Sequence, residues 1–387
     1  MDVYFMEKEH RLLKSSVYEW ARDYLGPIAE EIDRSDKFPD DIFKQMGELG
    51  ILGITIPQEY GGAGMDILSA LIVVEEIARF SPAVALSYGA HAILCADNIY
   101  RNGTEEQRQK YLPPLCSGDK VGAMALTEPG AGSDAVSIST KATFKENCYL
   151  LEGSKTFITN GPIADTLVVY AKTRPELGSK GISAFIVEKE FPGFSVSRTL
   201  EKMGMRGSPT GELFFDKCVV PKENLLGKEN QGVAVMMSGL DIERVFFSGL
   251  AIGLAQGAFD HSVKYAKERV QFGKPIGNFQ LIQSKLADMY TQIESSRIFS
   301  YHVARFATDK KKKSHRELHK KAAASVLYAG EMCNYVASEA VQIHGGYGYT
   351  LEFPVQRLMR DAKLMTIGAG TSEIRRLIVA REILKLS

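Results

Sequence analysis

The sequence contains little cysteine and no long apolar run. Its five cysteines are widely separated and form no C-x-x-C pair, so they indicate neither a disulfide framework nor a zinc site. No apolar stretch approaches the roughly 18 residues that a membrane span needs. Residues 1–7 also lack a basic leader followed by an apolar core. We therefore predict a cytoplasmic protein that binds no metal and does not span a membrane.

The chain also lacks a net charge. Lys and Arg total 47, as do Asp and Glu, which excludes the strong positive field of a dedicated nucleic-acid-binding protein. The charge is uneven, because residues 1–120 hold 12 basic and 20 acidic residues, a net of −8, and residues 121–387 carry the balancing +8. An anionic ligand would therefore bind more favourably to the second part of the chain.

The residue pattern divides the chain into three parts. Residues 1–120 predict an N-terminal domain of helices with short breaks. Residues 121–225 contain short β-prone runs separated by turn residues, as in an antiparallel sandwich or barrel. Residues 226–387 predict the long helices of a C-terminal four-helix bundle. The predicted fold class is therefore α+β multidomain, in the order helical domain, antiparallel β domain, helical bundle.

Local signals give finer predictions within these parts. The apolar spacing over residues 66–80 predicts a helix. A capping box at Thr104 predicts the start of a short helix that ends near Pro113 and Pro114. Residues 136–144 alternate as a strand does.

Glycine-rich segments are weaker signals, and each has two interpretations. Residues 130–135 fit G-x-G-x-x-A, but the alternating residues 136–140 follow where a nicotinamide-binding Rossmann turn would open a helix. The segment is therefore either a β-turn or an anion-binding nest. Residues 367–373 precede a helix, whose free N–H groups would suit phosphates or a thioester carbonyl, or form a simple capped turn. Residues 342–348 end a helix in glycines in the ordinary way.

One carboxylate, Glu243, stands out on physical grounds. On a helix over residues 233–250 its neighbours three, four and seven positions away are apolar or glycine, namely Met236, Gly239, Leu240, Phe246, Phe247 and Leu250. A carboxylate on such a stripe is buried, and burial raises its pKa toward the range in which a general base works best. An ion pair across the bundle is the alternative. Asp241 lies on a more mixed edge of the same helix.

Two histidines are spaced as metal ligands on a helix would be. His315 and His319 are four residues apart, but lysines and an arginine surround them in the sequence. A cationic setting disfavours a metal ion, so we predict a solvated helix face there.

Six segments together resemble the acyl-CoA dehydrogenase family. They occur in order along the chain and are residues 125–134, 157–161, 237–244, 269–273, 342–346 and 368–373. The resemblance covers the whole chain and is closest to the isovaleryl type of the family. It implies a homotetramer with one FAD per subunit. It also implies oxidation of an acyl-CoA substrate to its trans-2-enoyl-CoA, with electron-transfer flavoprotein as the acceptor.

The resemblance also assigns site residues. Thr127 and Thr159 would lie near the flavin ring, and Ser133 would also reach coenzyme A. Arg269 and Gln280, with residues 342–346 from a neighbouring subunit, would hold the FAD diphosphate and adenosine. The predicted FAD contacts are Met124, Ala125, Leu126, Thr127, Gly132, Ser133, Phe157, Ile158, Thr159, Arg269, Phe272, Gln280, Gln342, Ile343, His344, Gly345, Gly346, Thr371, Ser372 and Glu373. The predicted substrate contacts are Ser133, Asp241, Ile242, Arg244, Ala369 and Gly370.

The position of the catalytic glutamate separates branches of the family. Most members carry it immediately before the Gly-Thr of the C-terminal motif, where this chain has Ala369. The isovaleryl type places it on the earlier helix, where this chain has Glu243. The resemblance and the apolar stripe therefore both predict Glu243 as the base.

The resemblance implies oxidation of isovaleryl-CoA to 3-methylcrotonyl-CoA in leucine catabolism. Ala234 replaces an expected tyrosine near the acyl chain, and Met365 and Thr366 replace the usual Tyr-Glu. Another short, 2-methyl-branched or cyclic acyl-CoA therefore remains an alternative substrate. A catalytically silent helical scaffold is the alternative of a different class.

Overall fold

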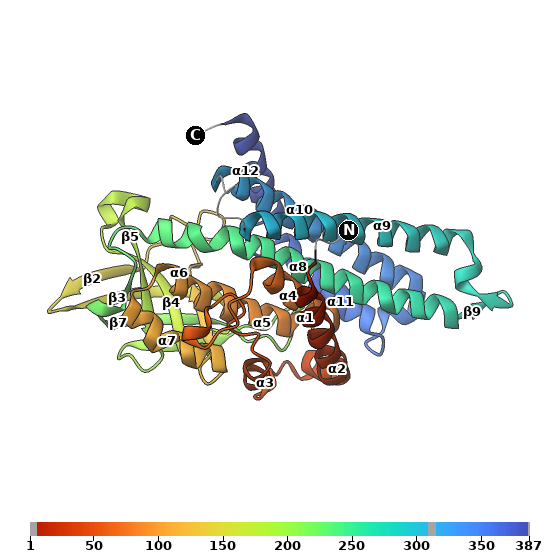
Figure 1. Cartoon of the computed structure of the whole chain (residues 1–387), viewed down its shortest axis with the longest axis horizontal. Coiled ribbons are helices and arrows are strands. Elements are labelled where there is room, and N and C mark those ends of the chain that lie inside the picture. The colour runs from red at the N-terminus through yellow and green to blue at the C-terminus, as the bar shows by residue number, and fades with distance from the viewer. Residues whose placement is uncertain (1–5, 309–314, 386–387) are drawn as a thin grey trace.

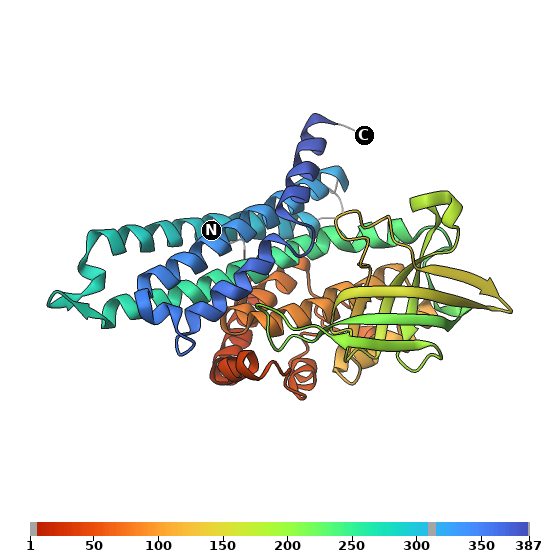
Figure 2. The same cartoon turned by 180° about the vertical axis from the view of Figure 1, so that it is seen from behind.

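The chain folds into three parts in the predicted order. The computed structural model describes residues 6–308 and 315–385. Figure 1 shows the β-sheet at one end of the molecule, the long helices of the bundle extending to the other end, and the N-terminal helices alongside them. The view from behind in Figure 2 shows the same arrangement. The α+β multidomain prediction is confirmed.

Helices form the N-terminal part. They are α1 (Lys8–Trp20), α2 (Gly26–Ser35), α3 (Ile42–Glu48), α4 (Ile67–Phe80), α5 (Pro82–Gly89), α6 (Asn98–Asn102) and α7 (Glu105–Ser117), with π-helical segments Ala21–Leu25 and Ala90–Asp97 between neighbours. The predicted helix over 66–80 is confirmed as α4. Its N-cap is Asp66, whose carboxylate accepts a hydrogen bond from the N–H of Ser69 at 2.8 Å.

The middle part is one sheet. Its strands are β1 (Gly122–Ala125), β2 (Lys141–Lys145), β3 (Cys148–Thr159), β4 (Thr166–Lys172), β5 (Ile182–Glu188), β6 (Phe194–Thr199), β7 (Thr210–Pro221) and β8 (Leu225–Leu226). They lie in the order β6-β7-β3-β2-β4-β5-β8, and β1 pairs with β4. Pairing is antiparallel, except that β4 runs parallel to β1 and meets β2 at one parallel bridge.

Both faces of the sheet are buried at β4. Successive side chains of a strand point to opposite faces. Val168 and Tyr170 of β4 accordingly pack in a core with residues of α6, α7 and α8, whereas Leu167 and Val169 pack in a second core within the sheet domain. The strand therefore fixes the sheet against the helices on one side and closes the domain on the other.

The C-terminal part is helical. It contains α8 (Gly232–Glu268), a short hairpin of β9 (Val270–Gln271) and β10 (Lys274–Pro275), α9 (Gln280–Thr308), α10 (His315–His344), α11 (Pro354–Ala362) and α12 (Ser372–Leu384). The longest helix, α8, packs against α4, α9 and α10 and contacts β5 near its beginning. It therefore touches all three parts of the molecule. Within the described ranges, no helix is long and apolar enough to cross a membrane.

Two local predictions are wrong. The helix from Thr104 continues through Pro113 and Pro114 to Ser117, because its buried side chains pack against the sheet domain and tertiary packing offsets the hydrogen bonds lost at proline. The predicted strand over 136–144 exists only from Lys141, since the N–H groups just before it bind a carboxylate instead of a neighbouring strand.

Close contact between α4 and α8 depends on glycine. A Cβ atom added at Gly253 would lie 2.1 Å from the carbonyl oxygen of Glu75, and one added at Gly249 would lie 2.8 Å from Val74 Cγ1. These distances are shorter than any van der Waals contact, so the two helices approach at positions where α8 has no side chain. Gly239 on the same helix differs, because its nearest atom is Asn98 Nδ2 at 3.9 Å.

We expect Gly253→Ala to lower the thermal midpoint of unfolding. The clash involves backbone, so the helices must separate, at a cost of about 1–3 kcal/mol. Gly239→Ala is the matched control and should leave the midpoint unchanged or raise it, because alanine is favoured over glycine in a helix by up to about 1 kcal/mol. Scanning calorimetry of the two variants tests this, and equal shifts would refute close packing at Gly253.

Candidate active site

Glu243 lies at the junction of the three parts. It is on α8, near Tyr170 of β4 and Arg375 of α12, and it keeps partial access to solvent. No hydrogen bond or ion pair to Glu243 is found within the described part of the chain. Burial raises the pKa of its carboxyl to about 7, although Arg244 and Arg375 act in the opposite direction. The alternative, an ion pair across the bundle, is not found between Glu243 and any described residue.

The neighbouring carboxylate is satisfied instead. Asp241 Oδ1 lies 2.8 Å from Arg244 Nη1 and 2.8 Å from Nδ1 of His319 on α10. The neighbours of Asp241 are polar, as its predicted place on a mixed helix edge requires. However, Asp241 itself is buried inside the protein. The predicted solvated helix face is wrong for His319, because its ring lies in this cluster. The side chain of His315 lies outside the described residues.

Sequence reasoning missed Arg375. This side chain is fully buried and donates to three carbonyl oxygens: Met365 at 2.7 Å, Gly368 at 2.5 Å and Val326 at 3.3 Å. It therefore fixes the turn that precedes α12. Ala369 and Gly370 follow in left-handed conformations, with φ of 54° and 85°. No periodic signal in the sequence marks Arg375, because the carbonyl groups that it binds lie on other elements.

A buried ion pair supports the loop after β1. Lys155 Nζ on β3 lies 2.8 Å from Glu128 Oε1 and donates to the carbonyl oxygen of Leu126 at 3.0 Å. Glu128 also accepts hydrogen bonds from the N–H groups of Ser139 and Thr140, so one carboxylate joins both ends of the loop. Burial opposes ionisation, but Lys155 and these donors lower the pKa of Glu128 to about 2. Residues 130–135, for which the sequence left a β-turn and an anion-binding nest open, lie within this loop.

An aromatic ring is exposed beside that loop. Phe157 near the end of β3 is 69% exposed and has a left-handed φ of 58°, at an irregularity in the pairing of β3 with β7. Asn160 after it is fully buried and donates to the carbonyl oxygens of Ser87 and Gly122. A side chain added at Gly132 would meet no atom within 4 Å. The surface is therefore rigid, open and suited to a flat aromatic group.

The other predicted cofactor contacts lie far from this surface. Arg269 and residues 343–346 line a cavity of about 500 Å³ near the β9–β10 hairpin, and Phe272 in that hairpin is 94% exposed. Figure 1 shows the hairpin at the opposite end of the molecule from the sheet. A single chain therefore does not bring all the predicted cofactor residues together.

The predicted substrate residues are not equivalent in the structure. Ile242 is 1% exposed and packs in the main core, since it points to a different side of α8 from Glu243. Ser133 is exposed, and Ala369 and Gly370 are partly exposed beside the fixed turn. Thr371 is the N-cap of α12, and the buried hydroxyl of Ser372 lacks a hydrogen-bond partner within residues 6–308 and 315–385.

Family models agree with the three-part structure. Those for the N-terminal, middle and C-terminal domains of acyl-CoA dehydrogenase match residues 7–119, 123–218 and 230–384. Two curated relatives from Solanum tuberosum are similar over nearly the whole chain. Isovaleryl-CoA dehydrogenase, mitochondrial, is 51% identical over 374 residues, 96% of this chain and 90% of the relative. The 2-methylacyl-CoA dehydrogenase, mitochondrial, is 49% identical over 382 residues, 98% of this chain and 92% of the relative.

A solved structure shows the same likeness in three dimensions. Butyryl-CoA dehydrogenase from Megasphaera elsdenii matches with a TM-score of 0.94 and 39% sequence identity, covering 98% of this chain and 99% of that chain.

We expect Lys155→Met to destabilise the protein strongly. Removing one partner leaves the buried Glu128 carboxylate without its counter-charge, which typically costs about 3–5 kcal/mol. Adding Glu128→Gln should recover most of that loss. Urea unfolding of both variants tests the pair, and a double variant as unstable as the single one would contradict it.

Proposed function

The chain belongs to the acyl-CoA dehydrogenase family of oxidoreductases, and on that premise we propose that it dehydrogenates the α,β bond of a short branched acyl-CoA. Isovaleryl-CoA is the first candidate substrate. The unpaired carboxylate of Glu243 is the observation that carries the proposal. The relative from Solanum tuberosum that is named for this substrate supports the choice.

Glu243 would act as the base that removes the α-proton. Its raised pKa, about 7, matches the proton affinity that a general base needs at neutral pH. Within residues 6–308 and 315–385, the carboxylate has no hydrogen-bond partner to give up before it accepts a proton. Arg375 holds the turn before α12, so the N–H groups near Ala369 and Gly370 would be preorganised to bind the thioester carbonyl as negative charge develops on it.

FAD is the cofactor we infer, because the residues present fit it in two separate groups. The exposed ring of Phe157 and the open loop around Gly132 fit the flat ring system of a flavin. When bound, FAD supplies the acceptor for the β-hydrogen as hydride. The residues that would hold the ring end are Met124, Ala125, Leu126, Thr127, Gly132, Ser133, Phe157, Ile158 and Thr159. Thr371, Ser372 and Glu373 at the beginning of α12 would instead complete the diphosphate and adenosine site.

The second group fits the diphosphate and adenosine. It comprises Arg269, Phe272, Gln280, Gln342, Ile343, His344, Gly345 and Gly346. Arg269 supplies a cation, and a Cβ at Gly345 or Gly346 would meet nothing within 4 Å, which leaves room for a ligand against the backbone. Because this group lies at the far end of the chain from Phe157, a second copy must supply it. We therefore propose a homo-oligomer, with a tetramer as the expected state and electron-transfer flavoprotein as the acceptor.

A scaffold without catalytic activity is less consistent with the site. A structural protein gains nothing from an unpaired, desolvated carboxylate, whose ionised form burial destabilises. In such a protein, selection for stability would favour pairing Glu243 or replacing it with an apolar residue.

A 2-methyl-branched acyl-CoA is the second candidate substrate. The relative named for 2-methylacyl-CoA is nearly as similar to this chain as the isovaleryl relative. The small side chain of Ala369 at the predicted acyl site accommodates either branch.

Rates of flavin bleaching by different acyl-CoA substrates separate these candidates. We expect isovaleryl-CoA to bleach the bound flavin faster than 2-methylbutyryl-CoA and butyryl-CoA, measured by stopped-flow absorbance under anaerobic conditions. Faster bleaching by either of the other two would reject isovaleryl-CoA as the preferred substrate. A flavin that no acyl-CoA bleaches would favour the scaffold.

We expect Glu243→Gln to retain FAD and oligomeric state but to lose flavin reduction by a factor of roughly 10²–10⁴, the usual contribution of a positioned base. Only the ionised carboxylate accepts a proton, so the wild-type rate should fall below pH 7 and level off above it, given a pKa of about 7. Glu317→Gln, a change at a half-buried residue on α10 that pairs with Lys320, is the control and should behave as wild type. Retained reduction in Glu243→Gln would place the base elsewhere.

A further inference from the structure

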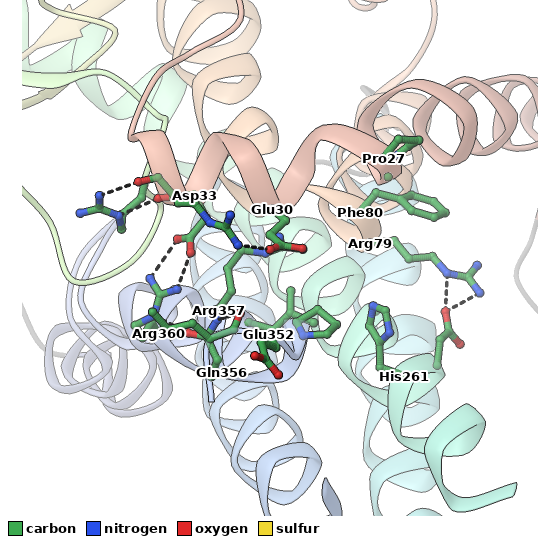
Figure 3. A pocket seen from close by; sticks show the side chains of 18 of the residues that line it. Pro27, Glu30, Asp33, Arg79, Phe80, His261, Glu352, Gln356, Arg357 and Arg360 are labelled. Carbon is green, nitrogen blue, oxygen red and sulfur yellow. Dashed lines mark hydrogen bonds and ion pairs between the residues drawn. The ribbon is translucent and has the colours of Figure 1, made fainter. Parts of the chain in front are cut away.

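A second cavity lies away from the candidate active site. It has a volume of about 750 Å³ and lies where α2 and the end of α4 meet α8 and the beginning of α11. Figure 3 shows residues of these elements converging on it. None of the predicted catalytic, cofactor or substrate residues lines it. Its position between the N-terminal helices and the bundle is one at which ligand sites commonly occur.

Most charged groups of the cavity are paired with one another. Asp33 holds Arg360 through two short contacts, and Asp260 holds Arg79 at 2.6 Å. Glu30 holds Arg34 on the same helix. The full lining has five arginines (Arg34, Arg79, Arg206, Arg357 and Arg360) and four acids (Glu30, Asp33, Asp260 and Glu352), so it carries a net charge of +1.

Arg357 is the exception among these arginines. It is on α11, is 9% exposed, and its buried Nε has no hydrogen-bond partner in the described part of the chain. Burial lowers the pKa of its guanidinium. The acids that act on it most are already engaged, since Asp33 binds Arg360 and Asp361 accepts from the N–H of Met205. Arg357 is therefore a desolvated cation whose hydrogen-bonding capacity is unused.

The beginning of α11 adds positive potential at the same place. This helix starts at Pro354, has no side-chain cap and has no acidic residue in its first turn. Its first N–H groups lack intrahelical partners, and the helix dipole favours an anion there. Pro354, Gln356 and Arg357 all line the cavity. The beginning of α11 and the unpartnered Nε of Arg357 thus lie at the same cavity.

The opposite end of the cavity carries apolar side chains beside the Arg79–Asp260 ion pair and His261. Pro27 and Phe80 lie there in Figure 3, away from Arg357 and Arg360. Tyr18 packs against Phe80 with ring centroids 5.5 Å apart. This wall suits an aliphatic or aromatic body, and the volume lies in the range that holds a drug-sized molecule.

We propose that this cavity binds a small organic anion. Its carboxylate or phosphate group pairs with Arg357 at the beginning of α11, and its apolar body packs toward Phe80 and Pro27. The occupant would contact the N-terminal helices and the bundle at once, and so hold the two parts together. The proposal does not depend on the proposed function, because the two sites share no residue.

Calorimetric titration of the assembled, FAD-loaded protein tests the proposal. The probes are phenyl phosphate, phenylacetate and the neutral phenylacetamide. We expect saturable binding of at least one anionic probe, and the stronger of the two identifies the anionic group. Phenylacetamide should bind much more weakly. Binding should be unchanged in Glu243→Gln, which distinguishes this cavity from the candidate active site.

Arg357→Gln is the decisive variant. Loss of a charge-assisted hydrogen bond of about 1.5–3 kcal/mol should weaken binding roughly ten- to hundred-fold. Removing an unpaired buried charge should not lower the thermal midpoint. Arg316→Gln is the matched control, because Arg316 is exposed and pairs with Glu382 away from the cavity; it should bind the probe as wild type does.

Several outcomes would overturn the proposal. They are no saturable binding of either anion, equal binding of phenylacetamide, or equal affinity in Arg357→Gln. A change of oligomeric state in Arg357→Gln without any probe binding would instead identify the cavity as a subunit contact. Should that variant not fold, a crystal structure with 4-bromophenyl phosphate provides the second measurement, since an anomalous bromine signal outside the cavity would equally refute the site.

Discussion

An unpaired, largely desolvated carboxylate is the constraint on which the rest of the structure depends. Burying Glu243 without a partner is unfavourable, and the raised pKa expresses that penalty. The position persists only if the surrounding elements cannot move to relieve it. The long helix α8 meets this condition, because it packs on α4, α9 and α10 at once and approaches α4 through Gly249 and Gly253. Stability away from the site thus permits an unstable arrangement within it.

The charged side chains described near Glu243 form no ion pair with it. Asp241 occupies one Nη of Arg244, and backbone carbonyl groups occupy Arg375. Both cations still lower the pKa of Glu243 somewhat, but neither forms an ion pair with it. A direct pair would stabilise the ionised form and reduce its tendency to take up a proton. Because backbone carbonyl groups accept the hydrogen bonds of Arg375, the turn before α12 is fixed. For the same reason Arg375 forms no ion pair with the Glu243 carboxylate on α8.

The sequence predicts what depends on local pattern. The order of helices and strands follows from hydrophobic period, and the same period placed Glu243 among apolar neighbours. Predictions are wrong where contacts between residues far apart in the sequence determine the local structure. The helix α7 continues through Pro113 because the sheet domain covers its apolar face, and Ser139 and Thr140 bind Glu128 instead of a strand. Neither the His319 contact nor the role of Arg375 has a local signal, since both bind groups on other elements.

The separation of the two cofactor groups has a consequence for assembly. Bundle helices of this length are stiff and pack along one another, so no hinge within the described ranges can bring Arg269 to Phe157. A cofactor held at both ends, as proposed above, would therefore lie between two copies of the chain. The ring of Phe272, which is 94% exposed in the single chain, would lie near such an interface. Cofactor binding and association would then stabilise each other, and a lone subunit would hold only half of the site.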